Sequence, residues 1–356
     1  MNNTNNQFNI SSKVMFKYWE NDSIFHKTLP KIVNESIPIP RDDNNIGHIK
    51  LYEDLHDNNI NIHTSDYFKK CDYDLEFHFH YNMPIANGKQ AYLIIPEVYQ
   101  IYYLNKYKYI KSKYKKIFTN LDEEVDNNQF LKINHPVPLD LPEITGFKNR
   151  STLACLIGSN KSLQYKYPNC GYTKRVEIAK FFENNFSTDF HMFGVGWDKP
   201  FYPPTIFGKI KKRLWKFSLN YVSAVHFHSY NGWTISKKKT MKNYKFVFCY
   251  ENVIGIPGYF CELIFDAFSS GTVPIYWGAG NVEKYIPENC FVDRRQFSNN
   301  NELVIFLKSI NEKQYIDYQN NIINFIKSPK SDIFKPAAYS KIILDELIKD
   351  YKINSI

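Results

Sequence analysis

The sequence predicts an α/β protein in which helices cover sheets of parallel strands. Three features predict this class: short apolar runs of strand length, segments of helical periodicity between them, and glycines at the ends of most of the runs. Alternation of strand and helix along a chain favours parallel sheets with helices on both faces.

The second half of the chain contains the clearest alternation. The run TLACLIGSN at 152–160 is a predicted strand that ends in Gly-Ser-Asn, and YTKRVEIAKFFENN at 172–185 has helical periodicity. The elements predicted after these are a strand at 190–197, a strand at 244–252, a helix at 259–271, a strand at 272–278 and largely helical structure from about 301 to 355.

The first half contains fewer recognisable elements. KVMFKYW at 13–19 and AYLIIPEV at 91–98 are predicted strands, and residues 99–119 are a predicted helix that leads into another short strand. The proline-rich segment NHPVPLDLPEITG at 134–146 lacks helical periodicity and is a predicted linker. We therefore expect domains at 1–145 and 146–330, and a C-terminal helix at 331–356 that packs back across the cleft.

Charge limits the classes of partner. The chain has 356 residues and a net charge of +9, and its lysines gather at 105–116, 208–216 and 236–245. Such clusters are either solvated helix faces or surfaces that attract an anion, for example a sugar nucleotide or an anionic lipid. No RNP-like, zinc-knuckle or helix-turn-helix pattern is present, so nucleic acid is not an expected partner. Residues 208–216 suit either peripheral contact with an anionic membrane or a surface helix that caps the ligand site.

The sequence also predicts a compartment. No apolar run approaches the roughly 18 residues that span a bilayer, and the N-terminus lacks the order of a signal peptide. None of the six cysteines forms a CxxC pair, which favours reduced, buried thiols. We expect a cytoplasmic protein.

Two carboxylates stand out in the apolar stretch 250–278. Buried carboxylates cost free energy unless they are paired or hydrogen-bonded, so Glu251 and Glu262 need partners or a ligand. Glu251 and Asn252 end a predicted strand, and Tyr259 to Glu262 open the next helix. Ligands of parallel sheets bind outside the carboxyl ends of the strands, and a helix N-terminus favours phosphate. The alternative is that Glu262 only complements the helix dipole and that Glu251 is a surface residue at a strand end.

The segment NYKFVFCYEN…GYFCELIFDAFSSGTVPIYWGAGNVEKYIP at 243–287 resembles the α-1,3-fucosyltransferase family, glycosyltransferase family 10. Upstream, IGSNKSLQYKYPNCGYTKRVEIAKFF resembles the Ser-Asn…Arg segment of that family, and IIPEVYQIY resembles the segment that presents a glutamate. The resemblance implies a GT-B type fold, with two Rossmann-like domains facing a cleft. It also implies inverting transfer of fucose from GDP-fucose to a hydroxyl of a glycan acceptor, with no metal and no other cofactor.

The resemblance assigns roles to individual residues. Glu97 is the expected catalytic base, which removes the proton of the acceptor hydroxyl. Arg175 is expected to bind the diphosphate, and Glu262 the hydroxyls of ribose or sugar. The other expected donor-binding residues line or floor the pocket: Glu251, Asn252, Tyr259, Ser159, Asn160 and Lys245.

The chain departs from the family at one position. The family has Thr-Glu-Lys where this chain has Cys261-Glu262-Leu263, and leucine cannot contact the donor phosphates as the lysine does. Either another base takes its place, with Lys245, Lys237 and Lys174 as the candidates, or the affinity for the donor is weakened. Two alternatives follow: a GT-B transferase that uses another nucleotide sugar, or a non-catalytic protein that binds sugar nucleotides or glycans.

Two further patterns imitate metal sites. Asp72 and Asp74 match the Asp-x-Asp motif of metal-dependent glycosyltransferases, but they lie in the wrong half of the chain for the donor site. Two His-Phe-His pairs, His78 with His80 and His226 with His228, lack a third ligand nearby in the sequence. No metal site is expected.

Overall fold

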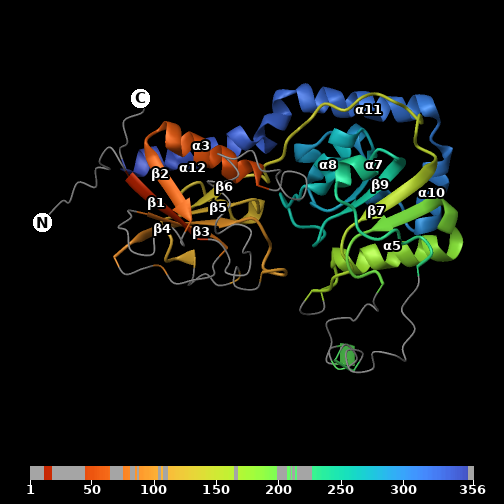
Figure 1. The fold of residues 1–356 in the computed structure, drawn as a ribbon, viewed down its shortest axis with the longest axis horizontal. Helices are drawn as coiled ribbons and strands as arrows, with labels where there is room; N and C mark the ends of the chain where they lie inside the picture. The colour runs from red at the N-terminus through yellow and green to blue at the C-terminus, as the bar shows by residue number, and fades with distance from the viewer. Residues whose placement is uncertain are drawn as a thin grey trace, which may run out of the picture. The chain divides into compact units, whose positions relative to one another are not determined.

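The computed structural model describes two compact units (Figure 1). Unit 1 comprises Met1–Pro138 and Asp332–Ile356, and unit 2 comprises Leu139–Ser331. The described residues are 12–17, 45–64, 75–80, 85, 88–102, 106, 111–163, 167–198, 207–208, 210, 213–214 and 227–351. Each unit contains one sheet whose described strands all run parallel, as the alternation of strand and helix predicts.

Unit 1 is built on a six-stranded sheet in its described part, with strand order β2-β1-β3-β4-β5-β6. The strands are β1 (Ser12–Lys17), β2 (Ile60–Thr64), β3 (Leu75–Phe79), β4 (Gln90–Ile95), β5 (Lys116–Thr119) and β6 (Phe130–Lys132). Strands β3, β4 and β5 are buried along almost their whole length, because a parallel sheet with covered faces exposes neither set of side chains.

Two helices of unit 1 pack against each other over this sheet. They are α3 (Ile46–Asp57) and α12 (Pro336–Tyr351), and Figure 1 shows them side by side. Leu51 and Leu55 of α3, and Ile343 and Leu347 of α12, repeat every four residues and so form one apolar stripe on each helix. The short helices η2 (Asp122–Glu124) and η6 (Pro329–Phe334) complete the described set.

The helix predicted at 99–119 is only partly testable. Val98–Tyr102 form a turn rather than a helix, β5 follows as predicted, and residues 103–105 and 107–110 lie outside the described residues. The predicted linker at 134–146 contains no helix or strand.

Unit 2 has a five-stranded sheet among its described residues, with strand order β11-β10-β9-β7-β8. The strands are β7 (Thr152–Ile157), β8 (Phe190–Phe193), β9 (Tyr244–Tyr250), β10 (Val273–Trp277) and β11 (Val292–Asp293). The helices are α5 (Gly171–Asn185), α7 (Lys237–Met241), α8 (Leu263–Ser270), α9 (Val282–Tyr285), α10 (Asn300–Ser309) and α11 (Glu312–Lys327), with η3 (Ser187–Asp189), η4 (Glu288–Cys290) and η5 (Arg294–Gln296).

The order of the strands places α5 and α8 on opposite faces of this sheet. Helix α5 connects β7 to β8, and α8 connects β9 to β10, so the two connections run across the sheet in opposite directions. Parallel connections are almost always right-handed, and opposite directions therefore require opposite faces. Figure 1 agrees, with α5 below the sheet and α8 above it.

Candidate active site

The carboxyl ends of the unit 2 strands gather the predicted donor-binding residues. Strand β9 ends at Tyr250 and is followed by Glu251 and Asn252, and β7 is followed by Gly158, Ser159 and Asn160. Because parallel strands end at the same edge, these two segments are neighbours, and helix α8 begins beside them. We call this edge the donor edge.

Glu251 is buried beneath the donor edge and stabilises it through hydrogen bonds. Its side chain accepts a hydrogen bond from the Cys261 N–H at 3.0 Å, and the Tyr276 hydroxyl donates to it at 3.4 Å. Its own N–H donates to the Trp277 carbonyl. Burial raises the pKa of Glu251 to about 7, although the hydrogen bonds from Cys261 lower it. The residue is 3% exposed, so the interpretation as a surface glutamate is wrong.

Arg175 binds the end of β9 from helix α5. Nε and Nη2 both donate to the Tyr250 carbonyl, and Nη2 also donates to Asn252 Oδ1 at 3.1 Å. Nη1 makes no hydrogen bond within the described residues and lies on the side of Gly158. The guanidinium is therefore partly a structural clamp, and one nitrogen remains to bind an anion.

Asn252 connects Arg175 to the entrance of α8. Its Nδ2 donates to the Tyr259 hydroxyl at 3.4 Å, and the Cys261 thiol contacts the same hydroxyl at 3.4 Å. Tyr259 is fully buried, so it supports the site from below, whereas Asn252 is partly exposed.

A lysine from another element reaches the first turn of α8. Lys237 Nζ lies 2.6 Å from Glu262 Oε1 and 3.3 Å from Asp266 Oδ2. Burial lowers the pKa of Lys237, but the two carboxylates outweigh it and the net direction is upward. Burial raises the pKa of Asp266 to about 7, while Lys237 opposes that rise. The Glu262 side chain retains 30% exposure, so a ligand can reach it.

The substituted position itself is apolar. Leu263 is 8% exposed and packs into the fold as the first residue of α8. The structure thus brings Lys237, one of the three candidate lysines, to the neighbourhood of this position. The other two lie elsewhere: Lys174 pairs with Glu177 at 2.7 Å, and Lys245 is at the amino end of β9 over the Phe147 ring. Glu251 lies six positions after Lys245 along the extended chain, or about 20 Å away.

The loops after β7 and β8 are fixed against each other. Asn160 donates two hydrogen bonds to the loop after β8: its N–H donates to the Val195 carbonyl and its Nδ2 to the Gly196 carbonyl, both at 2.9 Å. A side chain at Gly194 would overlap the Gly158 carbonyl, and its φ of +131° also favours glycine. Ser159 is held, partly exposed, in the middle of this turn.

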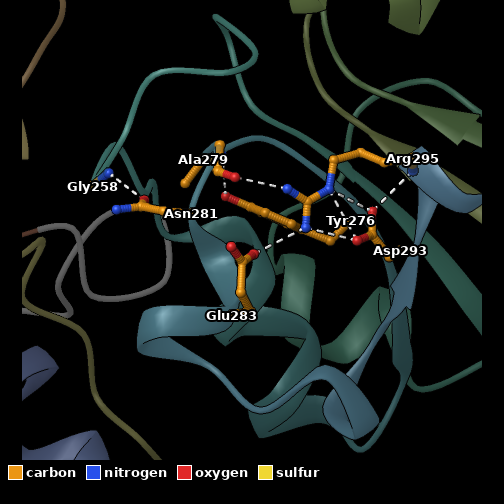
Figure 2. Close-up of polar contacts among 8 residues, drawn as sticks. Gly258, Tyr276, Ala279, Asn281, Glu283, Asp293 and Arg295 are labelled. Atoms are coloured by element: carbon orange, nitrogen blue, oxygen red, sulfur yellow. Dashed lines mark hydrogen bonds and ion pairs between the residues drawn. The ribbon is translucent and has the colours of Figure 1, made fainter.

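The loop after β10 makes a group of polar contacts that the sequence analysis did not predict (Figure 2). Arg295 donates to the Gly280 carbonyl at 2.8 Å and pairs with Asp293 and Glu283. Asn281 Oδ1 accepts from the Gly258 N–H at 2.9 Å, which fastens this loop to the one that precedes α8. The Gly278-Ala279-Gly280 spacing was the available signal, because closely spaced glycines mark tight backbone approach.

Comparisons with known proteins identify this part of the chain. Residues 220–323 match the model of glycosyltransferase family 10 (fucosyltransferase), C-terminal region. They include β9, α8 and β10, and hence Asn252, Tyr259 and Glu262. Residues 220–323 are thus similar to the C-terminal region of glycosyltransferase family 10.

Two curated relatives support the family assignment. The chain is 32% identical over 111 residues to the α-(1,3)-fucosyltransferase FucT of Helicobacter pylori, which covers 30% of this chain and 23% of the relative. It is 38% identical over 72 residues to an α-(1,4)-fucosyltransferase of Arabidopsis thaliana, which covers 20% of this chain and 18% of the relative. The matched segments thus span less than a quarter of either relative.

The similarity to solved structures covers almost the whole chain. An α1,3-fucosyltransferase crystallised with GDP has a TM-score of 0.50 at 15% identity and covers 97% of this chain and 92% of its own. Anabaena HepE in complex with UDP-glucose has a TM-score of 0.51 at 10% identity, with 95% and 99% covered. The predicted α/β fold of GT-B type, with two Rossmann-like units, is confirmed.

Glu97 lies in unit 1, outside the family 10 match. It follows β4 by two residues and is partly exposed, and the Asn120 side chain fixes the preceding Pro96 carbonyl at 3.2 Å. His80 directly follows β3 in the same sheet, and burial lowers its pKa to about 4, so it is neutral at physiological pH. Glu97 therefore stands at the carboxyl edge of its own sheet, where ligands of such sheets bind.

The two patterns that imitate metal sites lie only partly within the described residues. In the described part of the chain, no group of three His, Cys, Asp or Glu side chains could hold a metal ion. His78 is buried and bonds to Glu76 at 2.8 Å and to the Tyr114 hydroxyl at 2.7 Å. Asp72, Asp74 and His226 lie outside the described residues, whereas the His228 N–H donates to Glu183.

The predicted membrane contact falls mainly outside the described residues. In segment 208–216, only Gly208, Ile210, Arg213 and Leu214 are described, and the last three are exposed. No helix among the described residues has both the length and the apolar character to cross a bilayer.

Proposed function

We propose that this chain is an inverting glycosyltransferase that transfers fucose from GDP-fucose to a hydroxyl of a glycan acceptor. The observation that carries the proposal is the donor edge, where Asn252 and Glu262 lie within the family 10 segment and Arg175 binds Asn252. The names of the relatives support the donor, since both matched relatives are fucosyltransferases.

The donor edge suits a departing nucleoside diphosphate. The first N–H groups of α8 have no acceptor within the helix, and Glu262 caps none of them with its side chain. These N–H groups and Arg175 Nη1 can bind phosphate oxygens, whose negative charge grows as the glycosidic bond breaks. Stabilising that charge lowers the barrier to transfer.

We propose that Lys237 replaces the family's lysine indirectly. Its ion pairs with Glu262 and Asp266 fix the Glu262 carboxylate and neutralise charge that would repel a diphosphate. Glu262 then accepts hydrogen bonds from ribose or sugar hydroxyls. Leu263 needs no cationic role in this arrangement.

We propose Glu97 as the catalytic base. Its carboxylate would take the proton from the acceptor hydroxyl while the oxygen attacks the anomeric carbon, and GDP would leave from the opposite face. Attack opposite the leaving group inverts the configuration of that carbon. Ser159 and Asn160 would form the floor of the donor pocket.

The test is transfer of labelled fucose from GDP-fucose to a panel of oligosaccharides, with and without EDTA. We expect transfer that EDTA leaves unchanged, and a product whose anomeric configuration, measured by ¹H NMR, is opposite to that of the donor. Glu97→Gln should lower kcat by about 10³-fold, whereas Glu123→Gln, an exposed glutamate of the same unit, should not. Transfer that persists in Glu97→Gln would exclude the proposed base.

One observation favours a second candidate donor. Leu263 removes a phosphate contact of the family, and Anabaena HepE, which has the same fold, was crystallised with UDP-glucose. UDP-glucose therefore belongs in the same assay. Transfer from it alone would keep the glycosyltransferase and replace the donor, and binding of nucleotides without transfer from any donor would favour a non-catalytic protein.

A further inference from the structure

Unit 2 contains a hollow on the face of the sheet opposite α8. It has a volume of about 540 Å³ and lies beneath the ends of β9 and β10, between α5 and the segment Arg294–Asn300 that begins α10. Glu262 and Lys237 do not line it, because α8 covers the other face. We call it the Trp277 hollow. Its size is that of pockets that hold small molecules.

The wall of the Trp277 hollow is an aromatic ring with a cation at each side. Arg294 Cζ lies 5.1 Å from the centroid of the Trp277 ring, and Lys174 Nζ lies 5.8 Å from it. Tyr250 packs edge-on against the same ring at 5.4 Å. Three cationic side chains and one anionic side chain line the hollow: Lys174, Arg294, Arg295 and Glu177.

Arg294 differs from the other two cations of the hollow because it makes no close ion pair, although it is near enough to Glu302 for an electrostatic interaction. Arg295 pairs with Asp293 and Glu283, and Lys174 pairs with Glu177. Arg294 has no ion pair within the described residues, although it is only 9% exposed. Buried arginines are normally paired, because an uncompensated buried charge is costly.

The hydrogen bonds of Arg294 are also incomplete. Nη1 donates to the Phe297 carbonyl at 2.7 Å and Nη2 to Asn300 Oδ1 at 3.0 Å. Nε of Arg294 and the hydroxyl of Tyr250, which is 1% exposed, make no hydrogen bond of good geometry among the described residues, although the two side chains interact with each other. A hydroxyl that accepts from Arg294 still has its own proton to donate, and both residues line the hollow.

We propose that the Trp277 hollow binds a phosphate group carried by a small molecule, such as a sugar phosphate or a nucleoside monophosphate, at a site separate from Glu262 and the first turn of α8. Arg294 and Lys174 supply the positive charge, and the Tyr250 hydroxyl donates to a phosphate oxygen. A guanidinium suits this role because its planar fork matches two oxygens of one phosphate. The site goes beyond the proposed transferase activity and does not depend on it.

The test measures binding through Trp277, which lines the hollow. The chain has five tryptophans, so protein labelled with 5-fluorotryptophan gives a ¹⁹F NMR resonance for each, and Trp277→Phe identifies the one that reports on the hollow. The probes are inorganic phosphate, glucose 1-phosphate and GMP, titrated at constant ionic strength. We expect a saturable shift of the Trp277 resonance, and the tightest probe identifies the source of the phosphate.

Matched variants separate this site from the donor edge. Arg294→Gln should weaken binding by at least about tenfold, and Lys174→Gln by about fivefold. Glu177→Lys should strengthen it, which keeps the test valid if Arg294→Gln does not fold. Glu262→Ala should leave the shift unchanged, although it should abolish GDP binding at the donor edge.

Three results would overturn the proposal. They are a Trp277 resonance that stays still into the millimolar range, the same shift with sodium chloride, and unchanged binding in the Lys174 and Glu177 variants. A site that binds phosphate in protein that transfers no fucose would leave this inference standing and remove only the proposed function.

Discussion

Arg150 and Arg175 are buried at opposite ends of the same strand, β9. Arg150 donates to the carbonyl of Tyr244, the first residue of the strand, at 2.7 Å, and also to Thr272 Oγ1, Ser270 O and Gly271 O. Arg175 donates to the carbonyl of Tyr250, the last residue, and leaves Nη1 unused within the described residues. Both arginines order the strand, but only Arg175 lies at the carboxyl end, where ligands of parallel sheets bind. Arg150 Nε also lacks a partner within the described residues, but it is buried at the other end of the strand.

The same contrast holds for the other polar residues of the two ends. At the amino end, Tyr315 and Gln319 of α11 donate to backbone carbonyls of Lys245 and Gly271, so polar groups stabilise the fold. At the carboxyl end, Glu251 and Asp266 have pKa values raised by burial to about 7. A fold that keeps two such carboxyls at one edge sacrifices stability there, which is typical of functional sites. The predictions below test this division of roles.

The largest expected effect is on stability, from Arg150→Met. Removing the guanidinium leaves several buried acceptors without donors, and the free energy of unfolding should fall by about 3–5 kcal/mol. Urea denaturation followed by circular dichroism measures it. Lys148→Met, an exposed neighbour, should change stability little. If Arg150→Met were as stable as the wild type, the amino end would not be held as described.

Glu251→Gln should change how stability depends on pH. The folded pKa of about 7 lies above the usual value of 4.5, so the native state favours the protonated form and wild-type stability falls as pH rises from about 4.5 to 7. Glutamine still accepts the Cys261 N–H. We expect equal stability near pH 4.5, and a variant more stable by about 3 kcal/mol at pH 8.

Denaturation midpoints at several pH values measure this difference. Asp317→Asn, an exposed acid of α11, is the control and should show no such gain. Parallel pH profiles for Glu251→Gln and the wild type would contradict the burial of an ionisable Glu251.

Arg175→Gln should affect the ligand more than the fold. Glutamine can retain one bond to the Tyr250 carbonyl but cannot bind phosphate through a guanidinium, so GDP affinity should fall by about 30-fold. Isothermal titration calorimetry measures the affinity, and Lys180→Gln on the same helix is the control. A variant that loses stability but binds GDP normally would show that Arg175 stabilises the fold, as Arg150 does, and does not bind the ligand.

Lys237→Met should give the smallest of these effects. Without the ammonium group, Glu262 loses its 2.6 Å partner and Asp266 becomes protonated, so GDP affinity should fall by about tenfold. Lys239→Met, exposed on the same short helix, should bind as the wild type does. Equal affinities in both variants would remove Lys237 from the donor site.

The sequence predicted the fold and the donor edge because both depend on local pattern. Apolar runs of strand length located β7, β9 and β10, and the residues after a strand necessarily lie at its carboxyl end. The same logic places Lys245 away from the donor edge, since it is the second residue of the strand that Glu251 follows. That misplacement was avoidable from the sequence.

The remaining features depend on contacts between distant segments. Lys237 and Glu262 are 25 residues apart, and their ion pair requires α7 to pack against α8. Whether Arg175 binds a ligand or the Tyr250 carbonyl depends on how α5 crosses β9. Arg294 and Trp277 come together only through the pairing of β10 with β11. Periodicity within one element contains none of this information.

Thermal unfolding of the wild type and of Glu262→Ala, each with GDP, GDP-fucose, UDP or UDP-glucose, tests the central claim most directly. A ligand that binds only the native state raises its stability by mass action. The account predicts that GDP and GDP-fucose raise the Tm of the wild type, with or without EDTA, and that Glu262→Ala loses this rise. A Tm that no nucleotide changes, or a rise that Glu262→Ala retains in full, would contradict the claim that the donor edge binds the nucleotide sugar.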